Sequence, residues 1–200
     1  LAKQLGTGAE GVLLGAVADD VAAFGKYGVT KIHHVAGDVL NHVDTQVYTK
    51  AIADVAAASG ATVVVLSHNL TGKAIAARLS ARLKAGLVAG AVGLPNTSTG
   101  FVVKKAVFSG KAFAHMEVNT PVKILSISPN SFQTVAGEGT AEVVAANITV
   151  DTPKVKVTAT YKVTGQVPLS EAELVVSGGR GLKGPENWGM IEELAGLLGA

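Results

Sequence analysis

The residues best suited to bind a ligand form a glycine-rich turn late in the chain. The turn contains Gly178, Gly179, Arg180 and Gly181 and follows the apolar run 174–177. We expect a strand before the turn and a helix after it, so that the turn offers free backbone N–H groups and the positive end of a helix dipole. Arg180 adds a long cation that can reach a phosphate, an anionic ring or an acidic partner. This combination predicts a phosphate-bearing cofactor.

The same turn matches a dinucleotide-binding pattern as a string of letters. Residues 179–184 read G-x-G-x-x-G. In a dinucleotide fold the helix begins near the second glycine, whereas here Pro185 is expected at the first helical position and makes the loop longer. The acidic residue expected about twenty positions later falls past the last residue shown. Spacing alone leaves open an NAD-type site, a structural glycine turn and a site built on Arg180.

Other candidate side chains favour structural roles. His33 and His34 are neighbours in an expected strand, so they face opposite sides and cannot chelate one metal together. His42 could approach one of them, but no acidic residue has a suitable spacing, and we predict no metal site. The stretch 67–69 (Ser-His-Asn) ends a strand, and a strand-end histidine with a capping asparagine is the favoured interpretation. Without cysteine or a G-x-S-x-G turn, we predict no catalytic nucleophile.

The composition is that of a globular, apolar chain. Of its 200 residues, 48% are hydrophobic and 16% are charged, which leaves room for a partner chain to cover part of the surface. The net charge of +2 and the scattered lysines and arginines argue against nucleic acid. No apolar run reaches the length of a membrane span, so we predict a soluble protein.

The apolar pattern predicts alternating strands and helices. Residues 1–6 read as the end of a helix closed by Gly6, so we expect the first domain to lack its first strand and part of its first helix. The strand at 61–67 has unbroken β-branched character, typical of burial on both faces of a parallel sheet. The order is βαβαβα, which predicts a parallel sheet with right-handed crossovers. The other expected strands are 11–17 and 31–35, and the expected helices run from Asp19 or Asp20 to Gly28, from Asp44 to Ser59 and from Asn69 or Thr71 to Ala85.

The helical period disappears after Gly86. Strand-like runs at 87–92, 101–108, 112–118 and 122–127 are expected to extend the sheet with antiparallel strands, and 142–148 and 155–163 to form exposed or edge strands. We therefore predict an α/β domain over 1–165, a linker over 166–172, and over 173–200 the first βα unit of a second, doubly wound domain. A change in charge supports this boundary, because 171–200 holds five acidic residues against Arg180 and Lys183.

At this point the residues resemble a known family. The stretch 175–183 (VVSGGRGLK), followed by Glu186, Asn187 and Trp188, is similar to the opening of the flavin-binding domain in the α subunit of electron transfer flavoproteins. The helix at 71–83 and the segments 123–127 and 131–132 resemble other parts of the same family. The resemblance covers nearly all of the chain. One departure is the Gly-Pro pair at 184–185, which alters the turn before Glu186.

The resemblance implies a three-layer, mostly parallel sheet flanked by helices, of the adenine nucleotide hydrolase-like or Rossmann-like kind. It also implies an electron carrier and not an enzyme, in which an α subunit pairs with a homologous β subunit and holds FAD mainly in its second domain. Such carriers accept electrons from dehydrogenases, notably acyl-CoA dehydrogenases of fatty acid β-oxidation, and pass them to a quinone-linked oxidoreductase or another acceptor. The compartment would be the cytoplasm in a bacterium and the mitochondrial matrix in a eukaryote.

Among the site residues, the resemblance carries over Arg180, with Gly178, Gly179 and Gly181 as its backbone context. Arg180 is expected to stabilise reduced flavin or its phosphates, or to pair with an acid of the β subunit. Most of the FAD site would lie beyond residue 200, so the 200 residues alone should retain little FAD. The alternative function is a nucleotide-binding α/β domain of an NAD-dependent or other nucleotide-using enzyme, with the ligand held within residues 1–170.

Overall fold

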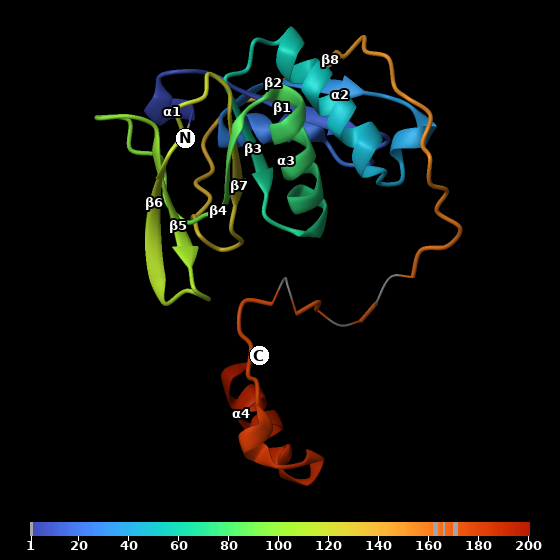
Figure 1. The fold of residues 1–200 in the computed structure, drawn as a ribbon. Helices are drawn as coiled ribbons and strands as arrows, with labels where there is room; N and C mark the ends of the chain where they lie inside the picture. Colours follow the sequence, from blue (N-terminus) through green and yellow to red (C-terminus); the bar gives the residue numbers. More distant parts are fainter. Residues whose placement is uncertain (1, 162–163, 166, 170–171) are drawn as a thin grey trace. The chain divides into compact units, whose positions relative to one another are not determined.

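The computed structural model describes residues 2–161, 164–165, 167–169 and 172–200 (Figure 1). The chain forms two compact units, Leu1–Lys156 and Val157–Ala200. The domain boundaries predicted at 165 and 173 stay a prediction. The first unit begins with helix α1 (Ala2–Leu5), which Gly6 follows with a left-handed backbone (φ 68°), as expected for the end of a helix.

The first sheet contains three parallel strands in the order β1 (Ala9–Leu14), β2 (Val29–Val35) and β8 (Glu142–Ala145). β8 comes from a segment that the sequence predicted as an exposed or edge strand, and it lies at the edge beside β2. After β8 the chain packs against the helix that follows β2, where the Lys50 ammonium donates to the Thr149 carbonyl at 2.9 Å.

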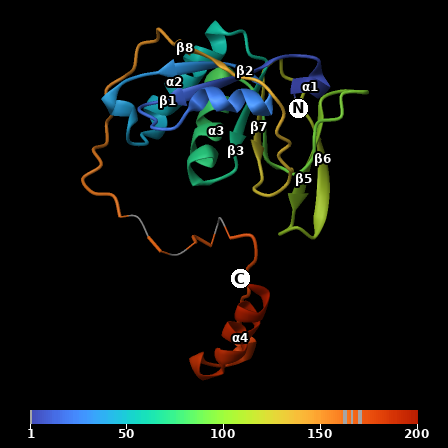
Figure 2. The same ribbon diagram turned by 180° about the vertical axis from the view of Figure 1, so that it is seen from behind.

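The second sheet has the order β3 (Val63–Ser67), β7 (Lys123–Ile127), β4 (Gly86–Ala91), β5 (Val102–Val107) and β6 (Ala112–Glu117). β5 and β6 form an antiparallel hairpin, as predicted, at the end of the sheet away from β3 (Figures 1 and 2). β4 pairs antiparallel with β5, as predicted, but the prediction of antiparallel pairing was wrong for β7 and its two neighbours. Strand β7 inserts between β3 and β4 and is parallel to both, a pairing between distant segments that no local pattern reveals.

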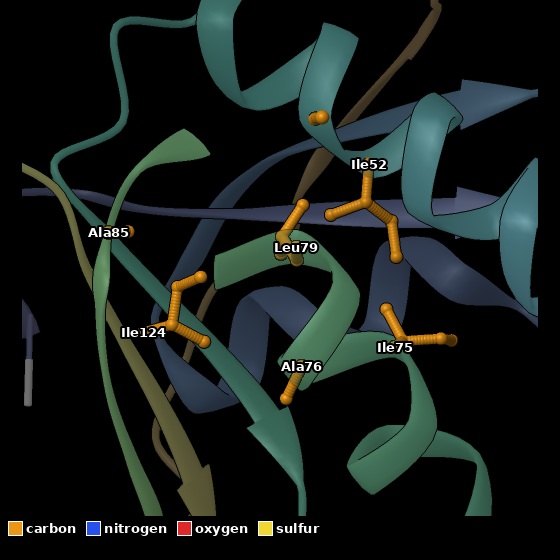
Figure 3. Packing of buried hydrophobic residues seen from close by; sticks show 7 residues of the cluster. Ile52, Ile75, Ala76, Leu79, Ala85 and Ile124 are labelled. Carbon is orange, nitrogen blue, oxygen red and sulfur yellow. The ribbon is translucent and has the colours of Figure 1, made fainter. Parts of the chain in front are cut away.

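Helices α2 (Thr45–Ala58) and α3 (Leu70–Leu83) lie side by side, and each buries an apolar face in the core (Figure 1). Asp44 caps α2 by accepting from the Gln46 and Val47 amides at 2.8 and 3.2 Å, and Asn69 caps α3 by accepting from the Gly72 amide at 2.8 Å. The inward residues of both helices meet the sheet in the cluster of Figure 3, which contains Ile52, Ala53, Ile75, Ala76, Leu79, Ala85 and Ile124.

A 3₁₀ helix, η1 (Val21–Tyr27), replaces the α-helix expected after the first strand. Asp20 caps it and Gly28 ends it with a left-handed backbone, both as predicted. Gly25 is buried in η1, and a side chain there would collide with the backbone of Thr140 and Ala141. This close approach joins η1 to the segment that leads into β8. A second short 3₁₀ helix, η2 (Asp38–Leu40), follows β2.

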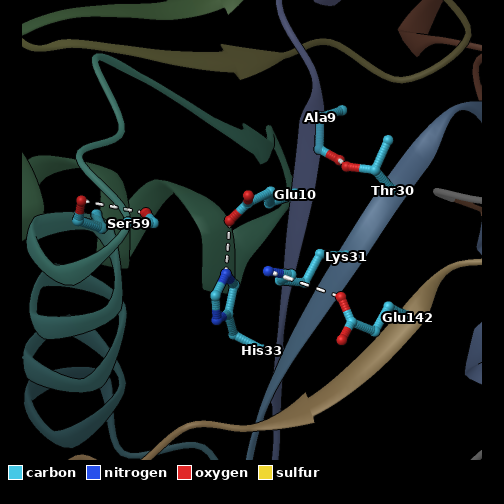
Figure 4. A network of polar contacts seen from close by, with 8 residues as sticks. Ala9, Glu10, Thr30, Lys31, His33, Ser59 and Glu142 are labelled. Carbon is cyan, nitrogen blue, oxygen red and sulfur yellow. Dashed lines mark hydrogen bonds and ion pairs between the residues drawn. The ribbon is translucent and has the colours of Figure 1, made fainter.

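Polar contacts tie the first sheet together (Figure 4). Glu10 on β1 lies 2.6 Å from the His33 ring on β2, and Lys31 on β2 pairs with Glu142 on β8 at 3.7 Å. Thr30 donates its hydroxyl to the Ala9 carbonyl at 3.1 Å. These contacts link neighbouring strands and leave the acid–histidine pair with a structural role.

Two predictions about strands need correction. β3 is not buried on both faces, because Val65 is 47% exposed. Residues 155–161 form no strand, and the remaining positions of that predicted strand, 162–163, lie outside the described residues. No helix in the described part of the chain is long and apolar enough to cross a membrane.

Candidate functional site

The glycine-rich turn lies in the second unit, ahead of the last helix. It contains the 3₁₀ turns η3 (Arg180–Leu182) and η4 (Pro185–Asn187), and α4 (Gly189–Leu198) follows. Pro185 begins η4, as the sequence predicted. The expected strand at 174–177 is not formed, because the described residues of this unit supply no second strand to hydrogen-bond with it.

Backbone hydrogen bonds fold the turn tightly around Arg180. The Leu182 amide donates to the Gly179 carbonyl at 3.0 Å, and the Lys183 amide donates to the Arg180 carbonyl at 3.1 Å. The turn's own bonds start at Leu182, so the amides of Arg180 and Gly181 are not used by them. The Arg180 side chain is exposed, and its guanidinium forms no ion pair or hydrogen bond with the residues that the structure describes.

The three glycines predicted as site residues have different surroundings. A Cβ at Gly178 would meet the Leu182 side chain and press on Trp188, so these two side chains pack closely over this glycine. A Cβ added at Gly179 or Gly181 would have no neighbouring atom within 4 Å, and neither residue has a positive φ. Packing and backbone geometry therefore do not require glycine at these two positions. An open backbone of this kind allows a ligand to approach the amides closely.

Asn187 connects the first helical turn to the glycine-rich turn. Its side-chain amide donates to the Leu182 carbonyl at 2.8 Å, two residues after Arg180. The sequence singled out Glu186 and Asn187 only as marks of a family, and their contacts were not predicted. The Glu186 carboxylate lies against Gly184, where a side chain would displace it. The Gly-Pro pair that departs from the family pattern therefore leaves room for Glu186.

A second polar cluster lies where β3, β4 and β7 end. The buried Ser126 hydroxyl is 2.8 Å from Nδ1 of His68 and accepts from the Gly90 amide at 3.1 Å. Gly90 forms a bulge in β4 with φ 76°, which turns its amide toward Ser126. Burial lowers the pKa of His68, and the charges of Lys73 and Lys105 lower it further. The sequence predicted a structural role for His68. It did not predict the role of Ser126, because a single serine within an apolar strand gives no signal of its partners.

The remaining histidine predictions concern His33 and His34. His33 contacts Glu10, whereas His34 lies 2.8 Å from the Gly15 carbonyl through its own Nε2, so the two rings have separate partners. Among the described residues no group of three metal-binding side chains comes together.

Comparison with known proteins shows which family the chain belongs to. A family model described as the electron transfer flavoprotein domain matches residues 1–151. The chain belongs to the electron transfer flavoprotein family. A second model, described as the electron transfer flavoprotein FAD-binding domain, matches residues 168–200 and so contains the whole Arg180 turn. The match covers the region that the sequence assigned to a second domain.

Similar proteins bear names from the same family. The electron transfer flavoprotein subunit alpha of Syntrophomonas wolfei is 30% identical over the whole chain, which covers 64% of that relative. The subunit alpha of Bacillus subtilis is 30% identical over 95% of the chain and 60% of its own length. A probable mitochondrial subunit alpha of Cryptococcus neoformans is 29% identical over the whole chain and 60% of its own length. The chain thus spans less than two thirds of the length of these relatives. The family matches do not favour the alternative function, a nucleotide-binding domain of an NAD-dependent or other nucleotide-using enzyme.

As an electron transfer flavoprotein chain, the molecule offers a turn that fits part of a flavin nucleotide. The fit rests on three features of the turn: a guanidinium without a partner among the described residues, backbone amides outside the turn's own hydrogen bonds, and two glycines with open space above them. Phosphate oxygens and an electron-rich ring are the acceptors that such donors bind.

Proposed function

We propose that this chain is part of the α subunit of a heterodimeric, FAD-containing electron carrier. The observation that carries the proposal is Arg180, which has no partner among the described residues and lies in an open glycine-rich turn within the region matched by the FAD-binding domain model. In such a carrier FAD supplies the redox chemistry by accepting and releasing electrons. The chain's residues supply binding, orientation and charge.

Arg180 would provide the charge. A guanidinium without an acidic partner among the described residues keeps its full positive field for a ligand, and its planar fork can bind two oxygens at once. Placed beside the flavin, it would favour the reduced form, which carries more negative charge. Placed beside the pyrophosphate, it would raise affinity and leave the potential nearly unchanged. Gly179 and Gly181 would let the ligand reach the backbone amides.

The partners follow from the family and are part of the proposal. We propose a homologous β subunit, dehydrogenases such as acyl-CoA dehydrogenases as electron donors, and a quinone-linked oxidoreductase or another acceptor. Exposed apolar side chains in both units are consistent with surfaces that other chains cover, among them Val65, Phe108, Leu174 and Met190. We propose a cytoplasmic location in a bacterium, or the mitochondrial matrix in a eukaryote.

The proposal is tested by producing the intact protein together with its partner subunit and measuring its absorption spectrum and bound nucleotide. We expect flavin absorption bands, FAD released on denaturation in stoichiometric amount, and bleaching of the bands by a reduced dehydrogenase. A colourless complex that binds NAD instead would contradict the proposal.

A further inference from the structure

The turn after Arg180 contains a backbone conformation that is costly for a residue with a side chain. Lys183 has φ 69° and ψ −48°. Across it, the Gly184 amide donates to the Leu182 carbonyl at 2.9 Å, which closes a three-residue γ-turn of the rare positive-φ kind. Such strain persists only where the surrounding structure holds it, and it is found often at functional sites.

Asn187 supplies the contact that holds this strained turn. The Leu182 carbonyl accepts from the Gly184 amide and, at 2.8 Å, from the Asn187 side chain. Both lone pairs of that oxygen are then used. The Asn187 backbone is itself fixed, because its amide donates to the Gly184 carbonyl at 3.2 Å and the Trp188 amide donates to the Pro185 carbonyl at 3.0 Å. The side chain therefore links the Leu182 carbonyl to the hydrogen-bonded turn η4.

The Leu182 carbonyl is close to Arg180 along the chain. The Lys183 amide belongs to the same peptide group as the Leu182 carbonyl, and it donates to the Arg180 carbonyl at 3.1 Å. A rotation of the Leu182–Lys183 peptide would therefore break the bond that fixes the Arg180 backbone. Hydrogen bonds thus connect the segment from Arg180 to Asn187. Asn187 donates through its side chain, and the other donors are backbone amides.

We infer that Asn187 is a positioning residue for Arg180, which acts by holding the strained turn at Lys183 and makes no contact with the flavin. The inference rests on the proposed function, because it assigns Arg180 to the flavin. It adds a residue beyond those that approach the ligand. On this inference, the Asn187 contact does more than start a helix, because it also sets the conformation of the ligand-facing loop.

Variants of the intact complex separate these roles. Asn187→Ala removes the donor, and Asn187→Asp keeps the shape but presents an ionised carboxylate that cannot donate. We expect each to raise the FAD dissociation constant about 3- to 10-fold, the ratio that the loss of one ordinary hydrogen bond produces. Glu193→Gln, an exposed change on α4, is the matched control and should leave the constant unchanged.

A second pair of variants tests the mechanism. Glycine adopts positive φ without strain, so Lys183→Gly should make the turn stable without the asparagine bond. We expect Asn187→Ala to weaken FAD binding much less in the Lys183→Gly background than in the native background. An equal effect in both backgrounds would overturn the inference. This comparison stays informative if Asn187→Ala alone folds poorly, because the double variant removes the strain.

The closing measurement is a double-mutant cycle of Arg180→Gln and Asn187→Ala, read as FAD affinity and reduction potential. If Asn187 acts through Arg180, the double variant should resemble Arg180→Gln alone. Additive losses, or no loss from Asn187→Ala, would overturn the inference and leave the proposed function standing. If Arg180→Gln itself changes neither quantity, the proposed role of Arg180 fails, and the inference fails with it.

Discussion

The residues of the Arg180 turn show which part of a site the sequence can reveal. Residue type alone marked Arg180 and its glycines, because a cation among small residues has few structural uses. The contacts of Asn187 depend on a folded turn, and neither its type nor its spacing indicates an acceptor at Leu182. The same is true of Ser126, whose partners His68 and Gly90 lie at the ends of different strands.

Asp44 gives a prediction about pH. The pKa of Asp44 lies below its ordinary value of 3.8, mainly because the carboxylate accepts a hydrogen bond from the Val47 backbone amide. This effect outweighs burial, which raises the pKa. Further backbone hydrogen bonds from Gln46, Lys154 and Val155 also lower it. Its stabilising effect is therefore complete above the ordinary value and is lost as the pH falls through the lowered one. Asp44→Ala should lower the free energy of unfolding by about 1–2 kcal/mol at neutral pH.

Urea unfolding at neutral pH and at acidic pH measures this effect of Asp44. The difference between Asp44→Ala and the native protein should shrink in acid, as the native carboxylate becomes protonated. Asp20→Ala is the control, since Asp20 caps η1 through an exposed bond from the Ala22 amide. A difference for Asp44→Ala that does not depend on pH would show that the carboxylate's charge is not what stabilises the helix start.

Ser126 gives a second residue-level prediction. Ser126→Ala leaves the buried Gly90 amide and His68 Nδ1 without their partner and should cost about 1–3 kcal/mol of stability. Ser67→Ala, at the exposed end of β3, is the control and should have little effect. Equal thermal midpoints for the two variants would contradict the structural role of this cluster.

At the scale of elements, start and stop signals were predicted well and pairing between distant strands was not. Asp20, Asp44 and Asn69 cap helices at the expected places, because each cap is satisfied by its own next turn. The insertion of β7 between β3 and β4 depends on residues that are far apart in the sequence. The expected strand at 174–177 is apolar enough, but a strand also needs a neighbour, and sequence pattern cannot supply one.

Helix α3 offers a test in which packing opposes helix propensity. A Cβ at Gly72 would collide with the Ser67 carbonyl, so Gly72→Ala should destabilise the first unit by about 1–3 kcal/mol. Propensity alone predicts the opposite, since alanine favours a helix by about 1 kcal/mol over glycine. Ala74→Gly, exposed on the same helix, should lose only that propensity difference. Chemical denaturation of both variants compares them, and a stabilised Gly72→Ala would contradict the packing argument.

At the scale of the whole molecule, the chain combines a unit with a continuous core and a unit that carries the ligand-facing turn. The first unit holds the three clusters of buried apolar residues, and the described residues of the second contain no buried side chain. We predict that limited proteolysis leaves a resistant fragment that ends between residues 156 and 173. Mass spectrometry of the fragment measures the boundary, and early cleavage within α2 or β7 would contradict it.

The central claim is that the Arg180 turn is part of an FAD site. Its most direct test compares the FAD content and the FAD dissociation constant of the intact complex with those of its Arg180→Gln variant, with Lys183→Gln as a control for the loss of a nearby cation. The account predicts stoichiometric FAD in the native complex, markedly weaker binding or a shifted reduction potential in Arg180→Gln, and a smaller effect in Lys183→Gln. A native complex without FAD, or an Arg180→Gln variant with unchanged affinity and potential, would contradict it.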